Sequence, residues 1–271
     1  MDADRSPAQV YDELFVPALF EPCARELLDF VPLREGERVL DVACGTGVVA
    51  RAAAGRVGER GHVTAVDLRA AMIAVAASRP APAGAGVAWR EGDAQALDLP
   101  DASFDAVLCQ HGLQFFSDPA RAVREMRRVA APGGRVGVSV WRGLEANNFM
   151  RRLVETEARH LAPLGIGFED TARPFLFGDP EWLRSLLGGE GLGDVRVESR
   201  RFEARFAASP TLVRDIEHAY SAVVPEFAAN PNAFAAFVAA VERDMQDELD
   251  ARRDGPAVVF WMRVNLAAGS A

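Results

Sequence analysis

Short apolar runs alternate with amphipathic stretches from about residue 38 to residue 141. The apolar runs are rich in Val, Ala and Leu, which is typical of buried strands, and they cover residues 38–43, 62–66, 87–90, 104–110 and 135–141. The stretches between them have helical spacing at residues 48–57, 69–78 and 119–129. Strands alternating with helices of about ten residues indicate βαβ units, which right-handed crossovers join into an open, mostly parallel sheet.

The flanking segments are less regular. Residues 10–30 predict two short helices interrupted by Pro17 and Pro22. After residue 141 the pattern predicts a helix over 147–162, an irregular stretch over 163–178, a helix over 181–187, a strand over 194–206, mostly helix over 210–253 and a last strand over 257–266.

We therefore expect one α/β domain over residues 1–271, with a Rossmann-like, doubly wound, mostly parallel seven-stranded sheet and helical cap insertions. In this interpretation residues 1–35 are cap helices and residues 37–141 are a ligand-binding core. Residues 142–271 complete the sheet and add helical insertions over a substrate.

Charge and composition exclude several classes of protein. The 30 basic residues are all Arg, and 39 acidic residues give a net charge of −9. An acidic excess argues against a nucleic-acid partner and an anionic membrane surface. Without Lys there is no Walker lysine, no Schiff-base lysine and no Tyr-x-x-x-Lys pair.

Three cysteines, Cys23, Cys44 and Cys109, lie far apart with no C-x-x-C pair. This excludes a disulfide framework or a zinc ribbon and fits a reducing compartment. The first residues are polar and acidic, unlike a signal peptide, and no apolar run approaches the ~18 residues of a membrane helix. We expect a cytoplasmic protein with no membrane span, and the sequence leaves its oligomeric state open.

The segment from Asp41 to Ala50 contains Gly45-x-Gly47-x-x-Ala50, and Asp67 follows Gly47 by twenty residues. Such a loop suits any adenosine-containing ligand, because glycines allow close backbone approach and an acid at the next strand end binds ribose hydroxyls. Asp41 would repel the pyrophosphate of a dinucleotide but would attract the ammonium of S-adenosylmethionine (SAM). The charge therefore favours SAM.

Four motifs occur together within residues 37–141: VLDVACGTG, AVDLRAAM, EGDAQALDLPDASFDAVLCQHGLQFF and EMRRVAAPGGRV. In order and spacing they resemble the class I SAM-dependent methyltransferases, nearest to the ubiquinone/menaquinone-biosynthesis branch and its small-molecule relatives. The resemblance implies SAM as cofactor, S-adenosylhomocysteine as product, and a small-molecule acceptor such as a secondary metabolite or a quinone-like aromatic. Methylation at O, N or C stays open.

The resemblance also implies roles for the ends of the first two strands. Asp41, Gly45 and Gly47 would hold the methionine portion of SAM, with Ala43 in the same loop, and Asp67 would bind the ribose hydroxyls.

Further along the chain, the resemblance places Leu68 and Met72 on the apolar faces of the adenine, although ordinary core packing would explain both. Asp93 and Ala94 would meet the adenine amino group. Tyr11, on the N-terminal helices, would close over the cofactor, and a buried helix contact is the alternative interpretation.

The end of the fourth strand brings Gln110 and His111 beside the methyl group in this resemblance. An oxygen or nitrogen acceptor must lose a proton, and a histidine with a near-neutral pKa suits a general base. His111 is therefore the candidate catalytic residue, with a shape or hydrogen-bonding role as the alternative. Trp141, which ends the fifth strand, is a candidate substrate contact.

Other chemistries have weaker support. Asp118 has no evident carboxylate partner, so we expect no metal, and the Asn-Pro-Pro-Tyr signature of base-amine methylation is absent. A non-methylating member of the fold and a nicotinamide-dependent oxidoreductase are the competing hypotheses. The acceptor pocket is expected from residues 143–178 and 210–252, with apolar walls or mutual packing from Phe149, Phe168, Phe175, Phe177 and Phe227.

Overall fold

The computed structural model describes residues 5–162, 166–220 and 231–271. The chain divides into two compact units. The sheet unit contains Cys23–Gly143, Pro174–Arg200 and Arg263–Ala271, and the helical unit contains the remainder, within Met1–Pro22, Leu144–Arg173 and Arg201–Met262. The single domain expected from the sequence stays a prediction.

Five parallel strands form the centre of the sheet: β1 (Arg38–Val42), β2 (His62–Asp67), β3 (Val87–Glu91), β4 (Phe104–Gln110) and β5 (Ala130–Trp141). Next come β8 (Ala257–Ser270), antiparallel to β5, and β6 (Gly193–Ala207), in the order β3-β2-β1-β4-β5-β8-β6. The doubly wound, mostly parallel sheet is confirmed. The predicted strand number is one too low, because the two-residue β7 (Arg253–Asp254) pairs with β8.

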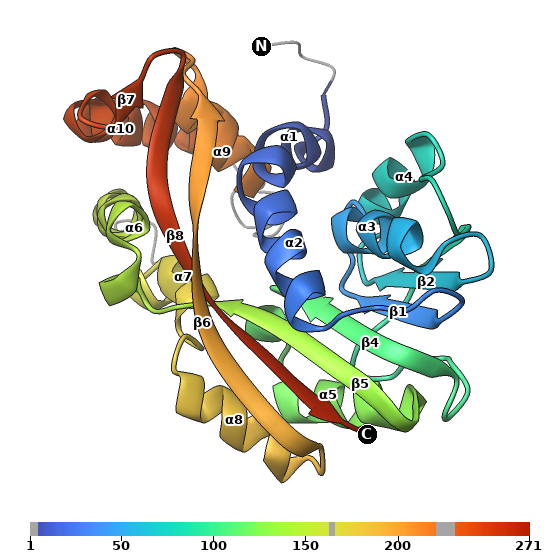
Figure 1. Ribbon diagram of the computed structural model, residues 1–271. Helices are drawn as coiled ribbons and strands as arrows, with labels where there is room; N and C mark the ends of the chain where they lie inside the picture. The colour runs from blue at the N-terminus through green and yellow to red at the C-terminus, as the bar shows by residue number, and fades with distance from the viewer. Residues whose placement is uncertain (1–4, 163–165, 221–230) are drawn as a thin grey trace. The chain divides into compact units, whose positions relative to one another are not determined.

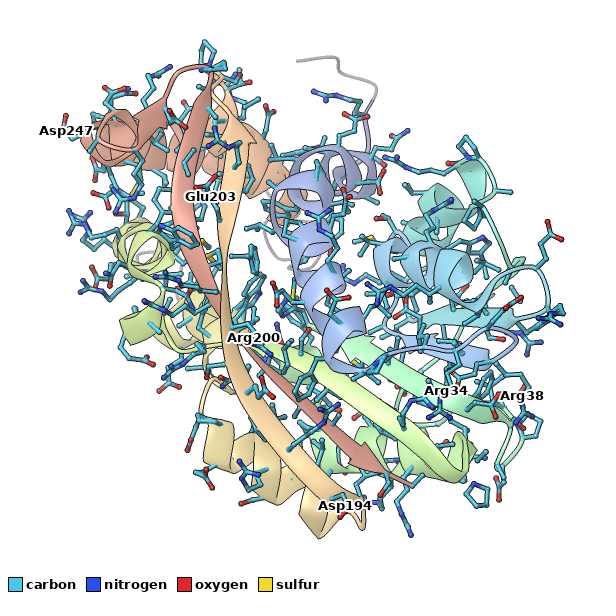
Figure 2. The ribbon with its side chains drawn as sticks, viewed as in Figure 1. Arg34, Arg38, Asp194, Arg200, Glu203 and Asp247 are labelled. Carbon is cyan, nitrogen blue, oxygen red and sulfur yellow. The ribbon has the colours of Figure 1, made fainter. Side chains whose placement is uncertain are left out.

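The amino end of β1 is fixed against β4 by an ion pair. Arg38 donates from Nη2 to Asp105 Oδ1 at 2.9 Å, and its backbone N–H donates to Asp105 Oδ2 at 2.8 Å. Figure 2 shows Arg34 and Arg38 together at this end of the strand. The rest of β1 is buried, as expected for a strand covered on both faces. The parallel pairing of Val39–Asp41 with Ala106–Leu108 brings the carboxyl ends of β1 and β4 side by side.

Helices cover both faces of the sheet unit (Figure 1). On one face lie α2 (Glu21–Phe30), α3 (Val48–Val57) and α4 (Ala70–Ser78), and on the other lie α5 (Pro119–Val129) and α8 (Pro180–Gly189). The second face encloses a core in which Met126 of α5 and Leu183 of α8 are fully buried with Val107 and Val138 of the sheet. The Asp118 side chain caps α5 by accepting from the Arg121 backbone N–H at 2.9 Å.

The helical unit contains α1 (Pro7–Phe15), the π-helix η1 (Val16–Phe20), η3 (Leu144–Ala146), α6 (Asn148–Leu161), α7 (Phe168–Ala172), α9 (Leu212–Tyr220) and α10 (Pro231–Asp250). Phe149 stacks on Phe260 at 4.0 Å between ring centroids, Phe206 on Phe260 at 5.7 Å, and Phe15 meets Phe206 edge-on at 6.4 Å. These rings form its aromatic core. No helix among the described residues combines the length and apolar character needed to span a bilayer.

The two short N-terminal helices are confirmed: α1 ends at Phe15, α2 begins at Glu21, and the π-helix η1, which contains Pro17, separates them. Two other details of the predicted elements are wrong. The stretch 163–178 is helical at α7 and at η5 (Arg173–Phe175), where the Gly167 N–H donates to Asp170 Oδ2 at 2.9 Å. Strand β5 begins five residues early, since Ala130 pairs with Phe104 before a bulge.

Candidate functional site

The loop between β1 and α3 requires glycine. Gly45 and Gly47 have φ of 56° and 92°, and Ala43 has φ of 55°. A Cβ at Gly47 would lie 2.3 Å from Cη2 of Trp89, the middle residue of β3. The backbone at Gly47 therefore lies directly against an indole ring, an approach that only a residue without a side chain permits.

Asp41 is a buried carboxyl just before this loop, with 1% of its surface exposed. Its Oδ2 accepts the Ala50 backbone N–H at 2.8 Å, and its Oδ1 is buried with no hydrogen-bond partner in the described chain. Burial, together with the nearby Asp67 carboxylate, raises the pKa of Asp41 to about 8. A buried carboxyl oxygen without a donor is suited to a cationic or N–H-bearing ligand.

Asp67, at the end of β2, joins the same loop. Its Oδ2 accepts the Gly45 N–H at 2.8 Å and its Oδ1 accepts the Arg69 N–H at 2.9 Å. Burial raises its pKa above the ordinary value, and the two backbone donors oppose that shift. The structure thus brings Asp41, Asp67 and the glycine loop together. Ribose binding by Asp67 stays a prediction.

The residues expected around the adenine lie in different environments. Leu68 is 66% exposed, whereas Met72 and Ala94 are buried. Asp93 Oδ1 accepts the Gln95 backbone N–H at 2.8 Å, which closes the turn after β3. Core packing accounts for Met72 and Ala94, and the adenine roles of all four residues stay predictions.

Tyr11 belongs to the helical unit. Its ring stacks on Phe20 at 5.1 Å between centroids and meets Phe15 edge-on at 5.7 Å. These contacts match the alternative interpretation of a helix packing residue, and closure over the cofactor stays a prediction.

His111 follows Gln110 at the end of β4 and has φ of 54°. Its backbone N–H donates to the Ser139 carbonyl at 2.9 Å, and its ring stacks on Trp141 with centroids 3.8 Å apart and planes 13° from parallel. Nε2 lies 3.2 Å from Cys23 Sγ. Trp141 therefore packs against one face of the imidazole, and Cys23 contacts its Nε2 edge.

The titration of His111 differs from the near-neutral value expected for a base. The side chain is 7% exposed, and burial lowers its pKa to about 3. An imidazole that is neutral throughout the physiological range accepts a proton reluctantly. This environment favours the alternative role in shape and hydrogen bonding, and catalysis by His111 stays a prediction.

Cys23 is a neighbour of His111 that the sequence did not indicate. It lies on α2, 88 residues earlier in the chain, and is fully buried, with Sγ 3.9 Å from Ser139 Oγ. Burial raises the pKa of this thiol to about 12, so it stays protonated. Cys23, Cys44 and Cys109 are all free and buried. Trp89, which covers Gly47, was also missed, because no local pattern links the two.

The helical unit contains two buried carboxyls, Glu157 on α6 and Glu217 on α9. Burial raises the pKa of Glu157 to about 7. Burial and the like charge of Glu157 raise the pKa of Glu217 well above its ordinary value. Ionisation of this pair therefore opposes folding of the unit.

The candidate aromatic walls are mostly packed against neighbours. Phe149 and Phe175 are buried, and Phe177 contacts Trp182 at 4.8 Å between centroids, whereas Phe168 is largely exposed. Phe227 lies outside the described residues. In the described segments, no group of three His, Cys, Asp or Glu side chains is arranged to hold a metal ion.

Part of the chain is similar in sequence to known methyltransferases. A family model described as a methyltransferase domain matches residues 39–134. The chain is 38% identical over 133 residues to nocamycin O-methyltransferase of Saccharothrix syringae, covering 49% of this chain and 47% of that protein. It is 39% identical over 117 residues to a ubiquinone/menaquinone biosynthesis C-methyltransferase of Ralstonia pickettii, covering 42% and 48%. The chain thus spans about half the length of these curated relatives.

Solved structures show the same fold. A putative methyltransferase from an antibiotic biosynthesis pathway of Anabaena variabilis superposes with a TM-score of 0.63 at 21% identity, covering 90% of this chain and 96% of that one. A putative methyltransferase of Bacillus halodurans gives 0.54 at 22% identity, covering 91% and 97%. Residues 39–134, which contain the glycine loop and both carboxyls, therefore match a methyltransferase domain, and the fold of the chain is that of solved methyltransferase structures.

Proposed function

We propose that the protein transfers the methyl group of SAM to a small-molecule acceptor. The observation that carries the proposal is the buried Oδ1 of Asp41, which has no donor in the described chain although it adjoins the glycine loop. SAM presents an ammonium group, which can donate to such an oxygen, and it has no phosphate for the carboxyls to repel. The residues at this site fit the cofactor.

In this proposal Asp41 and the loop from Ala43 to Gly47 hold the methionine portion, and Asp67 holds the ribose. Bound SAM supplies an electrophilic methyl group on a positively charged sulfur. The protein contributes mainly by aligning the acceptor with that methyl group and excluding water. His111 stacks on Trp141 and borders Cys23, and in this proposal its neutral imidazole shapes the site at the carboxyl end of β4.

Two of the relatives support a proposal for the acceptor class. One is an O-methyltransferase for nocamycin and another is a C-methyltransferase for quinone biosynthesis. We propose a secondary metabolite or a quinone-like aromatic as the acceptor. Because the three cysteines are free, we place the reaction in the cytoplasm, without a nucleic-acid partner.

The test combines binding with turnover. Thermal melts are recorded with SAM, S-adenosylhomocysteine or NAD at saturation, and labelled SAM is then offered with acceptor pools. We expect both sulfur ligands to raise the melting temperature and Asp41→Asn to weaken S-adenosylhomocysteine binding by roughly 10- to 150-fold, the equivalent of one charge-assisted hydrogen bond. Asp101→Asn, at an exposed carboxyl paired with Arg128, is the control and should leave S-adenosylhomocysteine binding unchanged. Stabilisation by NAD alone would refute the proposal.

A further inference from the structure

Gln114 is a buried amide with unused hydrogen-bonding capacity. Only 2% of its surface is exposed, and neither Oε1 nor Nε2 has a hydrogen-bond partner among the described residues. An amide offers two N–H donors and one carbonyl acceptor, and native proteins rarely leave all of them unused. This side chain is therefore suited to a ligand.

Two other amides in the sheet unit, Gln95 and Asn265, are paired on both sides. Gln95 donates from Nε2 to Asp93 and accepts at Oε1 from the Asp118 backbone N–H at 2.8 Å. Asn265 donates to the Gly178 carbonyl at 2.8 Å and accepts from Ser199 Oγ at 2.7 Å. Gln95 and Asn265 thus have both polar ends satisfied, whereas both polar ends of Gln114 lack a partner in the described chain.

The turn that carries Gln114 is fixed in place. Gln114 is the middle residue of the 3-10 helix η2 (Leu113–Phe115), closed by the Phe115 N–H donating to the Gly112 carbonyl at 2.9 Å. Leu113 is fully buried in the core. A Cβ at Gly112 would fall 2.8 Å from Cβ of Ala43, so the turn lies against the glycine loop. The backbone under Gln114 therefore cannot move far to expose the amide.

The position of η2 favours the acceptor over the cofactor. The carboxyls fitted to SAM stand at the ends of β1 and β2, whereas η2 follows β4, the neighbour of β1 on the other side. His111, the residue placed beside the methyl group, lies three positions before Gln114 on the same connection. The Gln114 amide thus lies after β4, next to the position that the proposal gives to the methyl acceptor.

We propose that Gln114 is a specificity-determining residue that binds a hydroxyl and its adjacent carbonyl on the methyl acceptor. An amide can donate to the carbonyl and accept from the hydroxyl at the same time, and Gln110 to Ser117 contains no acidic or basic side chain other than His111. An uncharged hydroxyl beside a carbonyl, as in an ortho-acylphenol, matches this pattern. The inference rests on the proposed function, since it names the acceptor of that reaction.

The first test is a melting comparison without ligand. Gln114→Leu removes the unpaired amide and keeps its approximate volume, so we expect the melting temperature to rise by about 2–4 °C. Gln95→Leu, the matched control, removes a paired amide and should lower it. A lower melting temperature for Gln114→Leu would overturn the proposal, because it would show that the amide has a structural partner.

The second test measures binding of probes by calorimetry to protein saturated with S-adenosylhomocysteine. We expect the wild type to bind methyl 3-hydroxy-2-naphthoate, an uncharged probe with adjacent hydroxyl and ester carbonyl groups, more tightly than 2-naphthol, which has the hydroxyl alone. Gln114→Leu should weaken the first probe about tenfold, abolish the preference and leave S-adenosylhomocysteine affinity unchanged.

Two results of the second test would overturn the assignment: no preference in the wild type, or a loss of S-adenosylhomocysteine affinity in Gln114→Leu, which would make Gln114 a cofactor residue. Failure of the wild type to bind S-adenosylhomocysteine at all would instead refute the proposed function. The melting comparison would still test the buried amide in that case.

Discussion

Gly47→Ala tests the architecture of the glycine loop. Gly47 has φ of 92°, a conformation that disfavours any residue with a side chain. In addition, the new methyl group would lie 2.3 Å from Cη2 and 2.6 Å from Cζ3 of Trp89. The substitution therefore combines backbone strain with a steric clash against an aromatic ring.

The two effects are separable in magnitude. A left-handed backbone costs a residue with a Cβ about 1–2 kcal/mol, and an extra methyl in a packed site costs about 1–3 kcal/mol. We expect Gly47→Ala to lower the free energy of unfolding by about 2–5 kcal/mol. Gly36 is the matched control, because its φ is 83° and a Cβ there meets nothing within 4 Å. Gly36→Ala should show only the backbone contribution.

Denaturant unfolding of both variants, with S-adenosylhomocysteine binding measured alongside, checks this expectation. Gly47→Ala should weaken binding as well as stability, whereas Gly36→Ala should leave binding intact. Trp89→Ala combined with Gly47→Ala should recover part of the lost stability, since it removes the clash but not the strain. Equal destabilisation by the two single variants would refute the steric part of the reasoning.

Two further predictions concern buried titratable groups of opposite pH dependence. Burial lowers the pKa of His111 to about 3, so its ring should stay neutral above about pH 4 in an NMR titration, and a titration midpoint near 6.5 would contradict this. The stability that the neutral ring contributes should be lost as pH falls below about 6.5. Burial raises the pKa of both Glu157 and Glu217, so stability should fall as pH rises from about 4.5 through 7. The melting temperature of Glu217→Gln should therefore vary less with pH across that range than that of Glu203→Gln, a control at an exposed carboxyl. Equal pH dependence in the two variants would contradict the raised pKa values of the buried pair.

Much of the fold was predictable because its signals are local. The segments at 48–57, 104–110 and 119–129 coincide with α3, β4 and α5. Each combines the right hydrophobic period with clear boundaries, such as the Asp118 cap before Pro119. The prediction was wrong where local signals conflict, as over residues 163–178, where Pro and Gly suggested an irregular chain although residues 168–172 and 173–175 form short helices.

The candidate site was predictable only in part. The sequence alone determined the glycine loop, the acids Asp41 and Asp67 and their order along the chain, because close backbone approach and charge at strand ends are written in consecutive residues. Only the tertiary structure decided that Trp89 covers Gly47, that Cys23 borders His111 and that Gln114 is buried without a partner. Burial and long-range contact set pKa values and hydrogen-bond satisfaction, and neither has a local pattern in the chain.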